Sequence, residues 1–166
     1  KLDFDVIAST VSDKDSSTIH FPTDLDITVK KRTDLSIKKD ASAPYVDANG
    51  DIYINYTVIV SSTEGWSDPI EILDQLNKND SASGEYVKNS FALCKIDSNG
   101  TKTSISSYNM AYETVTSTDD SFHITNLDGL KAGERYELTY KVKITKIKRA
   151  DGSFEFQNAA RSNNVN

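Results

Sequence analysis

Three polar side chains are predicted to point into the core of a β protein, because each alternates with apolar residues along its segment. They are the amine of Lys39, the carboxyl group of Asp74 and the carboxamide of Asn158. Residues two apart in a strand share one face of the sheet, and apolar neighbours mark the face that turns to the core. Those neighbours are Leu35 and Ile37 for Lys39, Ile70, Ile72 and Leu76 for Asp74, and Phe154, Phe156 and Ala160 for Asn158. An unpaired charge is costly in such a place, so these groups require partners.

The chemistry open to such groups follows from burial. An apolar environment lowers the pKa of a lysine and raises that of a carboxylic acid, so that the neutral amine and the neutral acid become accessible together. Only the neutral amine is a nucleophile. Alternatives remain at each position: Lys38 would point inward if a bulge shifted the register, Glu71 could be the acid, and Asn163 or Asn164 could be the amide. Alternation puts Glu71 on the outer face, and the two asparagines fall in a polar tail.

Other residues that could bind a metal ion or react form no recognisable site. His20 and His123 are far apart and lack partners at ligand spacing, so we expect neither a metal nor a cofactor. Residues 47–51 faintly resemble a calcium loop, but Val58 stands where an EF-hand needs a bidentate acid, and a hairpin turn explains them better. Cys94 is the single cysteine, so it forms no internal disulfide and is interpreted as a buried small hydrophobe.

The elements that would carry these side chains are strands. Apolar and polar residues alternate over residues 51–60, and Ile52, Ile54, Tyr56 and Val58 fall on one face. Further strands are predicted at residues 35–39, 70–76, 136–147 and 154–160, and turn sequences such as Asn49-Gly50 and Asp151-Gly152 separate them. Helical spacing is nearly absent. Several short strands at turn-sized intervals favour an all-β sandwich.

Length and composition set further limits. A chain of 166 residues with 37% hydrophobic and 27% charged residues is expected to fold around one main core. The net charge of -6 comes without a basic stripe, so nucleic acid is not an expected partner. No apolar run approaches the length of a membrane span, and Lys1 begins without a charged and then apolar leader. We therefore expect any export signal or wall anchor to lie outside this fragment.

We divide the chain between residues 33 and 34, because residues 33–37 read like the start of a fresh module. Residues 2–6 and 25–29 are strand-like and are separated by the polar stretch 12–18. Residues 1–33 are therefore either extra strands of the same sandwich or the end of a preceding module.

Several segments together resemble the repeat domains of Gram-positive bacterial surface proteins, namely the collagen-adhesin-like and fimbrial modules that form internal isopeptide bonds. Residues 34–39 look like the opening strand of that family, 52–60 and 69–76 like its next strands, 130–140 like its late hairpin and 156–160 like its closing strand. The resemblance covers residues 34–166 and implies an immunoglobulin-like antiparallel β-sandwich with extra strands.

The resemblance also implies roles for three residues. Lys39 would attack the side-chain carbonyl of Asn158, while protonated Asp74 would polarise that oxygen and pass a proton to the departing ammonia. Each molecule would react once, on itself, so the chain is not expected to be an enzyme. The cross-link would join the opening and closing strands of a structural module in a cell-wall-attached adhesin or pilus, outside the cell, with neighbouring modules of the same protein as partners.

Two other functions remain open. The region 86–118 is less regular, and with Trp66 in a loop and Tyr112 it could bind a host glycan or matrix protein. Core packing is the expected place of most tyrosines there. An accessory carbohydrate-binding module of a secreted enzyme would fit the same fold.

Overall fold

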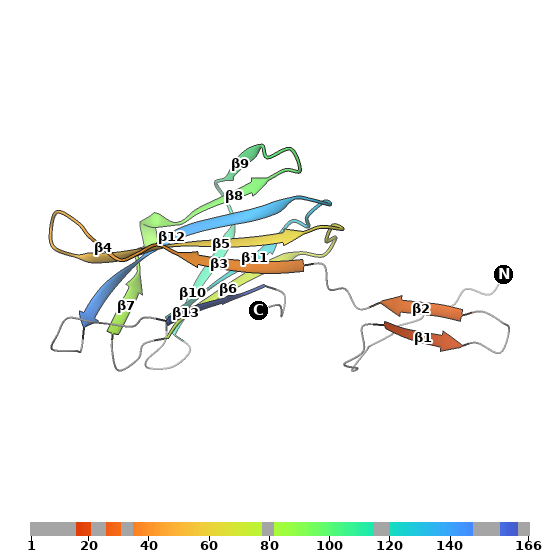
Figure 1. Ribbon diagram of the computed structural model, residues 1–166, viewed down its shortest axis with the longest axis horizontal. Coiled ribbons are helices and arrows are strands. Elements are labelled where there is room, and N and C mark those ends of the chain that lie inside the picture. The colour runs from red at the N-terminus through yellow and green to blue at the C-terminus, as the bar shows by residue number, and fades with distance from the viewer. Residues whose placement is uncertain are drawn as a thin grey trace. The chain divides into compact units, whose positions relative to one another are not determined.

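The computed structural model describes residues 16–20, 26–30, 35–77, 82–114, 120–147 and 157–162. The chain divides into two compact units, residues 1–33 and 34–166. In the first unit, β1 (Ser16–His20) and β2 (Asp26–Lys30) pair as an antiparallel two-stranded sheet (Figure 1). Strand β2 overlaps the strand-like segment 25–29. Strand β1 begins inside the polar stretch that was expected to separate strands, and the strand-like residues 2–6 lie outside the described residues.

The second unit is built from two antiparallel sheets, with a single short 3-10 turn, η1 (Lys88–Ser90), among its described residues. The smaller sheet has the order β10 (Asn109–Thr114), β11 (Asp120–Leu127), β6 (Ile70–Asn77) and β13 (Gln157–Arg161). The larger sheet has the order β3 (Leu35–Ala41), β5 (Ile52–Ser62), β12 (Arg135–Ile147), β8 (Ala92–Ile96) and β9 (Lys102–Ile105), with β4 (Tyr45–Val46) paired to β5 and β7 (Ala82–Tyr86) paired to β12.

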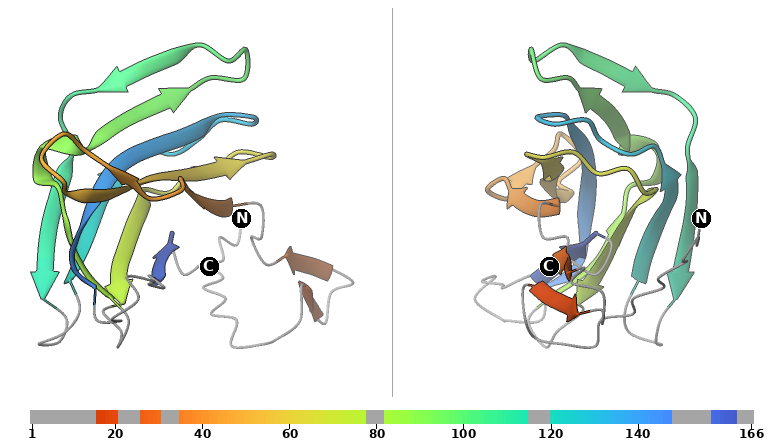
Figure 2. Two further views of the ribbon diagram at one scale, coloured as in Figure 1. Left: turned by 60° about the vertical axis from the view of Figure 1, so that its left-hand side comes forward. Right: turned by 90° about the vertical axis from the view of Figure 1, so that its right-hand side faces the viewer.

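The core lies between the two sheets, which Figure 2 shows as two layers. Alternation along β5 buries Ile54, Tyr56, Val58 and Val60, as a strand with one face on a core requires. From the facing sheet, β6 and β11 contribute buried apolar residues to the same cluster. The prediction of an all-β antiparallel sandwich is confirmed.

The region that the sequence suggested to be irregular is in fact largely strand. Within residues 86–118, β8, β9 and β10 occupy residues 92–96, 102–105 and 109–114, and β7 ends at residue 86. These strands are short, and β9 is mostly exposed and polar, so its sequence carries little of the alternation that reveals a strand with one buried face.

The loop after β5 is tied to the segment before β12 by an isolated bridge. Trp66 and Leu130 exchange backbone hydrogen bonds of 2.7 and 2.8 Å. Gly129 permits this approach, because a Cβ atom at that position would lie 2.2 Å from the carbonyl oxygen of Trp66. The glycine therefore matters here for space, not for backbone freedom.

Two edge strands meet where the sheets approach each other. Strand β3 is at the edge of the larger sheet, β13 is at the edge of the smaller sheet, and the two are in contact. Figure 1 shows β13 beneath β3, with β6 beside it. The first and last described strands of the second unit are thus brought together from opposite sheets.

Candidate functional site: a buried amine, acid and amide

Asp74 is a fully buried carboxyl group on an otherwise apolar face. It lies on β6 between Ile72 and Leu76, which are also fully buried, so the pleat turns it into the core. Its Oδ1 accepts a hydrogen bond of 2.7 Å from the hydroxyl of Tyr86. Its Oδ2 accepts a bond of 2.7 Å from the hydroxyl of Tyr140 and also contacts Nζ of Lys39. Three donors from three other strands therefore converge on one carboxyl group.

Lys39 reaches this acid from the larger sheet. It lies opposite the fully buried Val58 in the pairing of β3 with β5, which places it on the inner face. Its side chain is 12% exposed, whereas that of Lys38 is 70% exposed and pairs with Asp40 at 2.7 Å. The register thus excludes Lys38 as the inward lysine. Nζ of Lys39 also lies 4.7 Å from the ring centre of Tyr56, a cation–π distance.

Asn158 is the third residue of this cluster and comes from the smaller sheet. In the pairing of β13 with β6 it lies opposite Leu76, so it shares the inner face with Asp74. Its Nδ2 donates a hydrogen bond of 3.2 Å to the hydroxyl of Tyr140. Its Oδ1 is buried and has no hydrogen-bond partner among the described residues. The amide nitrogen is therefore bonded to Tyr140, whereas the amide oxygen has no donor among the described residues.

The sequence left alternatives to Asp74 as the acid and to Asn158 as the amide. Glu71 is on the outer face, half exposed, with an oxygen 3.4 Å from Nε2 of His123. Asn163 and Asn164 lie outside the described residues, as do Phe154 and Phe156, whose spacing helped to predict the inward direction of Asn158. Lys39, Asp74 and Asn158 are the predicted residues that the structure brings together.

Burial shapes the proton chemistry of the cluster. It lowers the pKa of the Lys39 ammonium from 10.5 to about 8, although the charge of Asp74 and its hydrogen bond act in the opposite direction. Burial, with a further contribution from the charge of Asp74, raises the pKa of Tyr56 to about 12. The same causes raise the pKa of Tyr140 far above its usual range. The amine is thus easier to deprotonate than usual, while both phenols keep their protons.

The tyrosine hydroxyls are the functional groups that sequence reasoning missed. Tyr140 and Tyr56 lie opposite each other in the pairing of β12 with β5 and stack with ring centres 5.5 Å apart. Both were predicted only as strand residues, because a tyrosine on an apolar face signals core packing as readily as chemistry. The hypothesis from sequence had Asp74 acting directly on the carbonyl oxygen of Asn158. The hydrogen bonds described here instead connect the acid to the amide through the hydroxyl of Tyr140.

The aromatic residues proposed for ligand binding lie in different surroundings. Trp66 is half-buried and packs against the core cluster beside its bridge to Leu130. Tyr112 is 40% exposed on β10, and Nζ of Lys88 lies 4.9 Å from its ring centre. Of the other tyrosines in this region, Tyr86 is buried and Tyr108 packs against the core.

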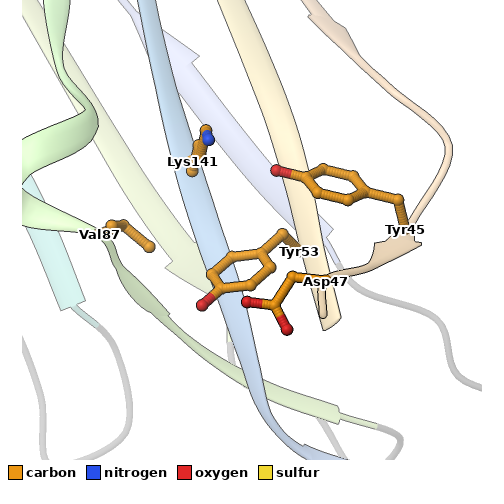
Figure 3. A pocket seen from close by; sticks show the side chains of 5 residues that line it. All are labelled: Tyr45, Asp47, Tyr53, Val87 and Lys141. Carbon is orange, nitrogen blue, oxygen red and sulfur yellow. The ribbon is translucent and has the colours of Figure 1, made fainter. Parts of the chain in front are cut away.

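A small pocket of about 240 Å³ offers a different ligand surface. Its lining residues are Tyr45, Asp47, Tyr53, Val87 and Lys141, shown in Figure 3. The rings of Tyr45 and Tyr53 stack with centres 5.8 Å apart. Asp47 Oδ1 accepts hydrogen bonds from the backbone N–H groups of Asn49 and Asp51, which confirms the turn predicted for residues 47–51.

No group of three or more His, Cys, Asp or Glu side chains among the described residues could hold a metal ion. No helix within these residues has the length and apolar character needed to cross a bilayer. Cys94 is buried and unpaired, as predicted.

No model of a known protein family and no curated protein matches the chain. Among solved structures it is similar to the family 3a carbohydrate binding module from the cipA scaffolding of Clostridium thermocellum, with 15% identity and a TM-score of 0.44 over 79% of this chain and 97% of that one. It is also similar to ACE19, the collagen binding subdomain of the Enterococcus faecalis surface protein ACE, with 13% identity and a TM-score of 0.44 over 81% and 97%. A third is the KRT10-binding region domain of the pneumococcal serine rich repeat protein PsrP, with 11% identity and a TM-score of 0.27 over 78% and 88%. At these values the likeness carries no information on what this chain binds or does.

Proposed function

We propose that residues 34–166 form a structural module of a bacterial cell-surface adhesin or pilus, locked by an amide cross-link between Lys39 and Asn158. The observation that supports this most is the buried pair of Lys39 and Asp74 beside a carboxamide whose carbonyl oxygen has no partner among the described residues. A buried ion pair alone contributes little net stability, because desolvation offsets its attraction. A chemical role explains better why these groups are buried together.

The reaction begins with a proton transfer inside the ion pair. Lys39 gives a proton to the Asp74 carboxylate, which leaves a neutral amine and a neutral acid. The amine nitrogen attacks Cγ of Asn158, and the tetrahedral intermediate then loses the amide nitrogen as ammonia. A new amide bond joins Nζ of Lys39 to Cγ of Asn158, with no oxidant and no cofactor. Because each chain reacts once and is not regenerated, the protein is not an enzyme.

The position of the proposed bond suits a mechanical role. Strands β3 and β13 are edge strands of opposite sheets, and they are the first and last described strands of the second unit. Tension applied at the two ends of this unit would reach the cross-link before it could peel either strand from its sheet. Such resistance is useful in a stalk of modules on a cell surface. The same proposal therefore places the protein outside the cell, attached to the wall, with neighbouring modules as partners.

Intact mass measurement of the purified chain tests the proposal. We expect wild type to be lighter than its sequence by one ammonia, and Lys39→Ala and Asp74→Ala to have the full sequence mass. Lys38→Ala and Asn109→Ala are matched controls, because both residues are exposed, and they should keep the loss. Wild type at full sequence mass would refute the cross-link.

A second candidate function is saccharide binding at the pocket of Tyr45 and Tyr53. Aromatic rings beside a carboxylate and an ammonium group favour a ligand with both apolar faces and hydroxyl groups. A volume of about 240 Å³ is below the roughly 300–1,000 Å³ of most ligand pockets, so the site suits a single sugar ring. On a glycan array, Tyr45→Ala should abolish binding and Tyr112→Ala should not. The reverse result would favour the surface predicted from the sequence instead.

A further inference from the structure

We propose that the hydroxyl of Tyr140 delivers the proton that turns the amide nitrogen of Asn158 into a leaving group. The inference rests on the cross-link proposed above and names a catalytic residue for it. The phenol oxygen donates to Oδ2 of Asp74 at 2.7 Å and accepts from Nδ2 of Asn158 at 3.2 Å. It is thus the shared neighbour of the acid and of the nitrogen that must depart.

The proton needs a carrier because it starts on Lys39, moves to Asp74 and must end on the amide nitrogen of Asn158. Lys39 contacts Oδ2 of Asp74, so the proton from the amine arrives on that oxygen. An amide nitrogen leaves as ammonia only after it has gained a proton. Among the described residues no hydrogen bond joins Asp74 to Asn158 directly, whereas both are bonded to Tyr140. The route from acid to amide therefore passes through the phenol.

A hydroxyl group can carry this proton because it donates and accepts at once. In the first state Tyr140 donates to the ionised Asp74. Once Asp74 holds the proton from Lys39 and the amine has attacked Cγ, the direction reverses. Asp74 gives its proton to the phenol oxygen, and the phenol gives its own proton to Nδ2. The C–N bond to that nitrogen then breaks, ammonia leaves, and the attacking nitrogen loses its second proton to Asp74. Tyr140 ends as a neutral phenol, as it began.

The surroundings hold the Tyr140 ring in one place. It stacks on Phe91 with ring centres 5.1 Å apart and planes at 9°, and it meets Phe122 edge to face at 5.3 Å. Tyr56 stacks on it from the paired strand. This packing involves the ring and not the hydroxyl, so replacing Tyr140 by phenylalanine removes the proton carrier with little change in shape. The raised pKa of Tyr140 keeps the phenol protonated, so the phenol can pass its proton on only as it receives another from Asp74.

Tyr86 provides a matched control within the same site. Its hydroxyl also donates to Asp74 at 2.7 Å, but to Oδ1, and no described hydrogen bond connects it to Asn158. Removal of either hydroxyl takes one hydrogen bond from the acid. Only removal of the Tyr140 hydroxyl also breaks the path to the leaving nitrogen.

The test follows ammonia loss over time in the full chain, made by cell-free synthesis and sampled by intact mass, with near-ultraviolet circular dichroism as the check of folding. Because positioned proton donors contribute roughly 10²–10⁴-fold, we expect Tyr140→Phe to slow the loss by more than about tenfold and Tyr86→Phe by less than about threefold. Equal rates for Tyr140→Phe and wild type would overturn the relay but not the cross-link. Equal slowing by Tyr140→Phe and Tyr86→Phe would do the same. Wild type that never loses ammonia would overturn the cross-link itself.

A second variant covers the case in which Tyr140→Phe does not fold. The amino acid 3-fluorotyrosine at position 140 keeps the ring and the hydroxyl but makes the phenol more acidic. The relay predicts a larger change in the rate of ammonia loss with this residue at position 140 than with it at position 86. An unchanged rate at position 140 would overturn the inference.

Discussion

Replacement of Asn158 by alanine isolates what the cross-link contributes to stability. Lys39→Ala would also remove the cross-link, but unlike Asn158→Ala it would leave the buried Asp74 without a cation in the unlinked chain, which by itself costs roughly 3–5 kcal/mol. The side chain of Asn158 donates a hydrogen bond of 3.2 Å to Tyr140 and interacts with the hydroxyl of Tyr56, and its carbonyl oxygen has no hydrogen-bond partner among the described residues. Its loss apart from the cross-link should therefore cost only about 1 kcal/mol.

The cross-link itself is expected to contribute much more. It would close a loop of about 119 residues, and the chain-entropy relation derived for disulfides gives about 5 kcal/mol for such a loop. The second unit has about 130 residues, so its entropy of unfolding is near 0.28 kcal/mol per kelvin. Together with the roughly 1 kcal/mol for the other contacts of Asn158, the replacement Asn158→Ala should then lower Tm by about 21 °C.

Differential scanning calorimetry on wild type, Asn158→Ala and Asn109→Ala measures this difference. Intact mass on the same samples shows which of them carry the cross-link. The exposed Asn109 provides the control, and its replacement should shift Tm by no more than about 2 °C. If wild type has lost ammonia and Asn158→Ala still melts within about 4 °C of it, the reasoning that the bond constrains the unfolded chain is wrong.

Two further predictions concern the unlinked site and the fold. Between the folded pKa of about 8 and the ordinary value of 10.5, the unfolded chain keeps a proton on Lys39 that the folded chain has lost, so the free energy of unfolding of Asn158→Ala should rise with pH there. Urea denaturation at about pH 7.5 and about pH 9.5 measures this rise. Adding Lys39→Met to Asn158→Ala should remove the rise, and a rise of the same size in the double variant would show that other groups cause it. Gly129→Ala should destabilise the second unit by roughly 1–3 kcal/mol in urea, because its Cβ would lie 2.2 Å from the carbonyl oxygen of Trp66, whereas replacement of the exposed Asp128 by alanine should have little effect. Equal stability of Gly129→Ala and wild type would show that the Trp66–Leu130 bridge can move.

Alternation in the sequence was enough to identify the strands that have one buried face. Residues 35–39, 51–60, 70–76 and 136–147 were all predicted as strands, and β3, β5, β6 and β12 cover them to within a few residues. The pleat has a period of two, so it also showed that Lys39 and Asp74 point inward and that Lys38 and Glu71 do not. Local pattern failed where strands are short and polar, as at β9 and in the segment that became β1.

The sequence by itself thus determined which side chains face the core, because that depends only on the neighbours of each residue along its own strand. Which of them meet was decided by the tertiary structure, since Lys39 and Asn158 lie on edge strands of different sheets. The same holds for Tyr86 and Tyr140, whose hydroxyls reach Asp74 from two further strands. Contacts between residues so far apart depend on how two sheets pack and in what register, and no local pattern contains that information.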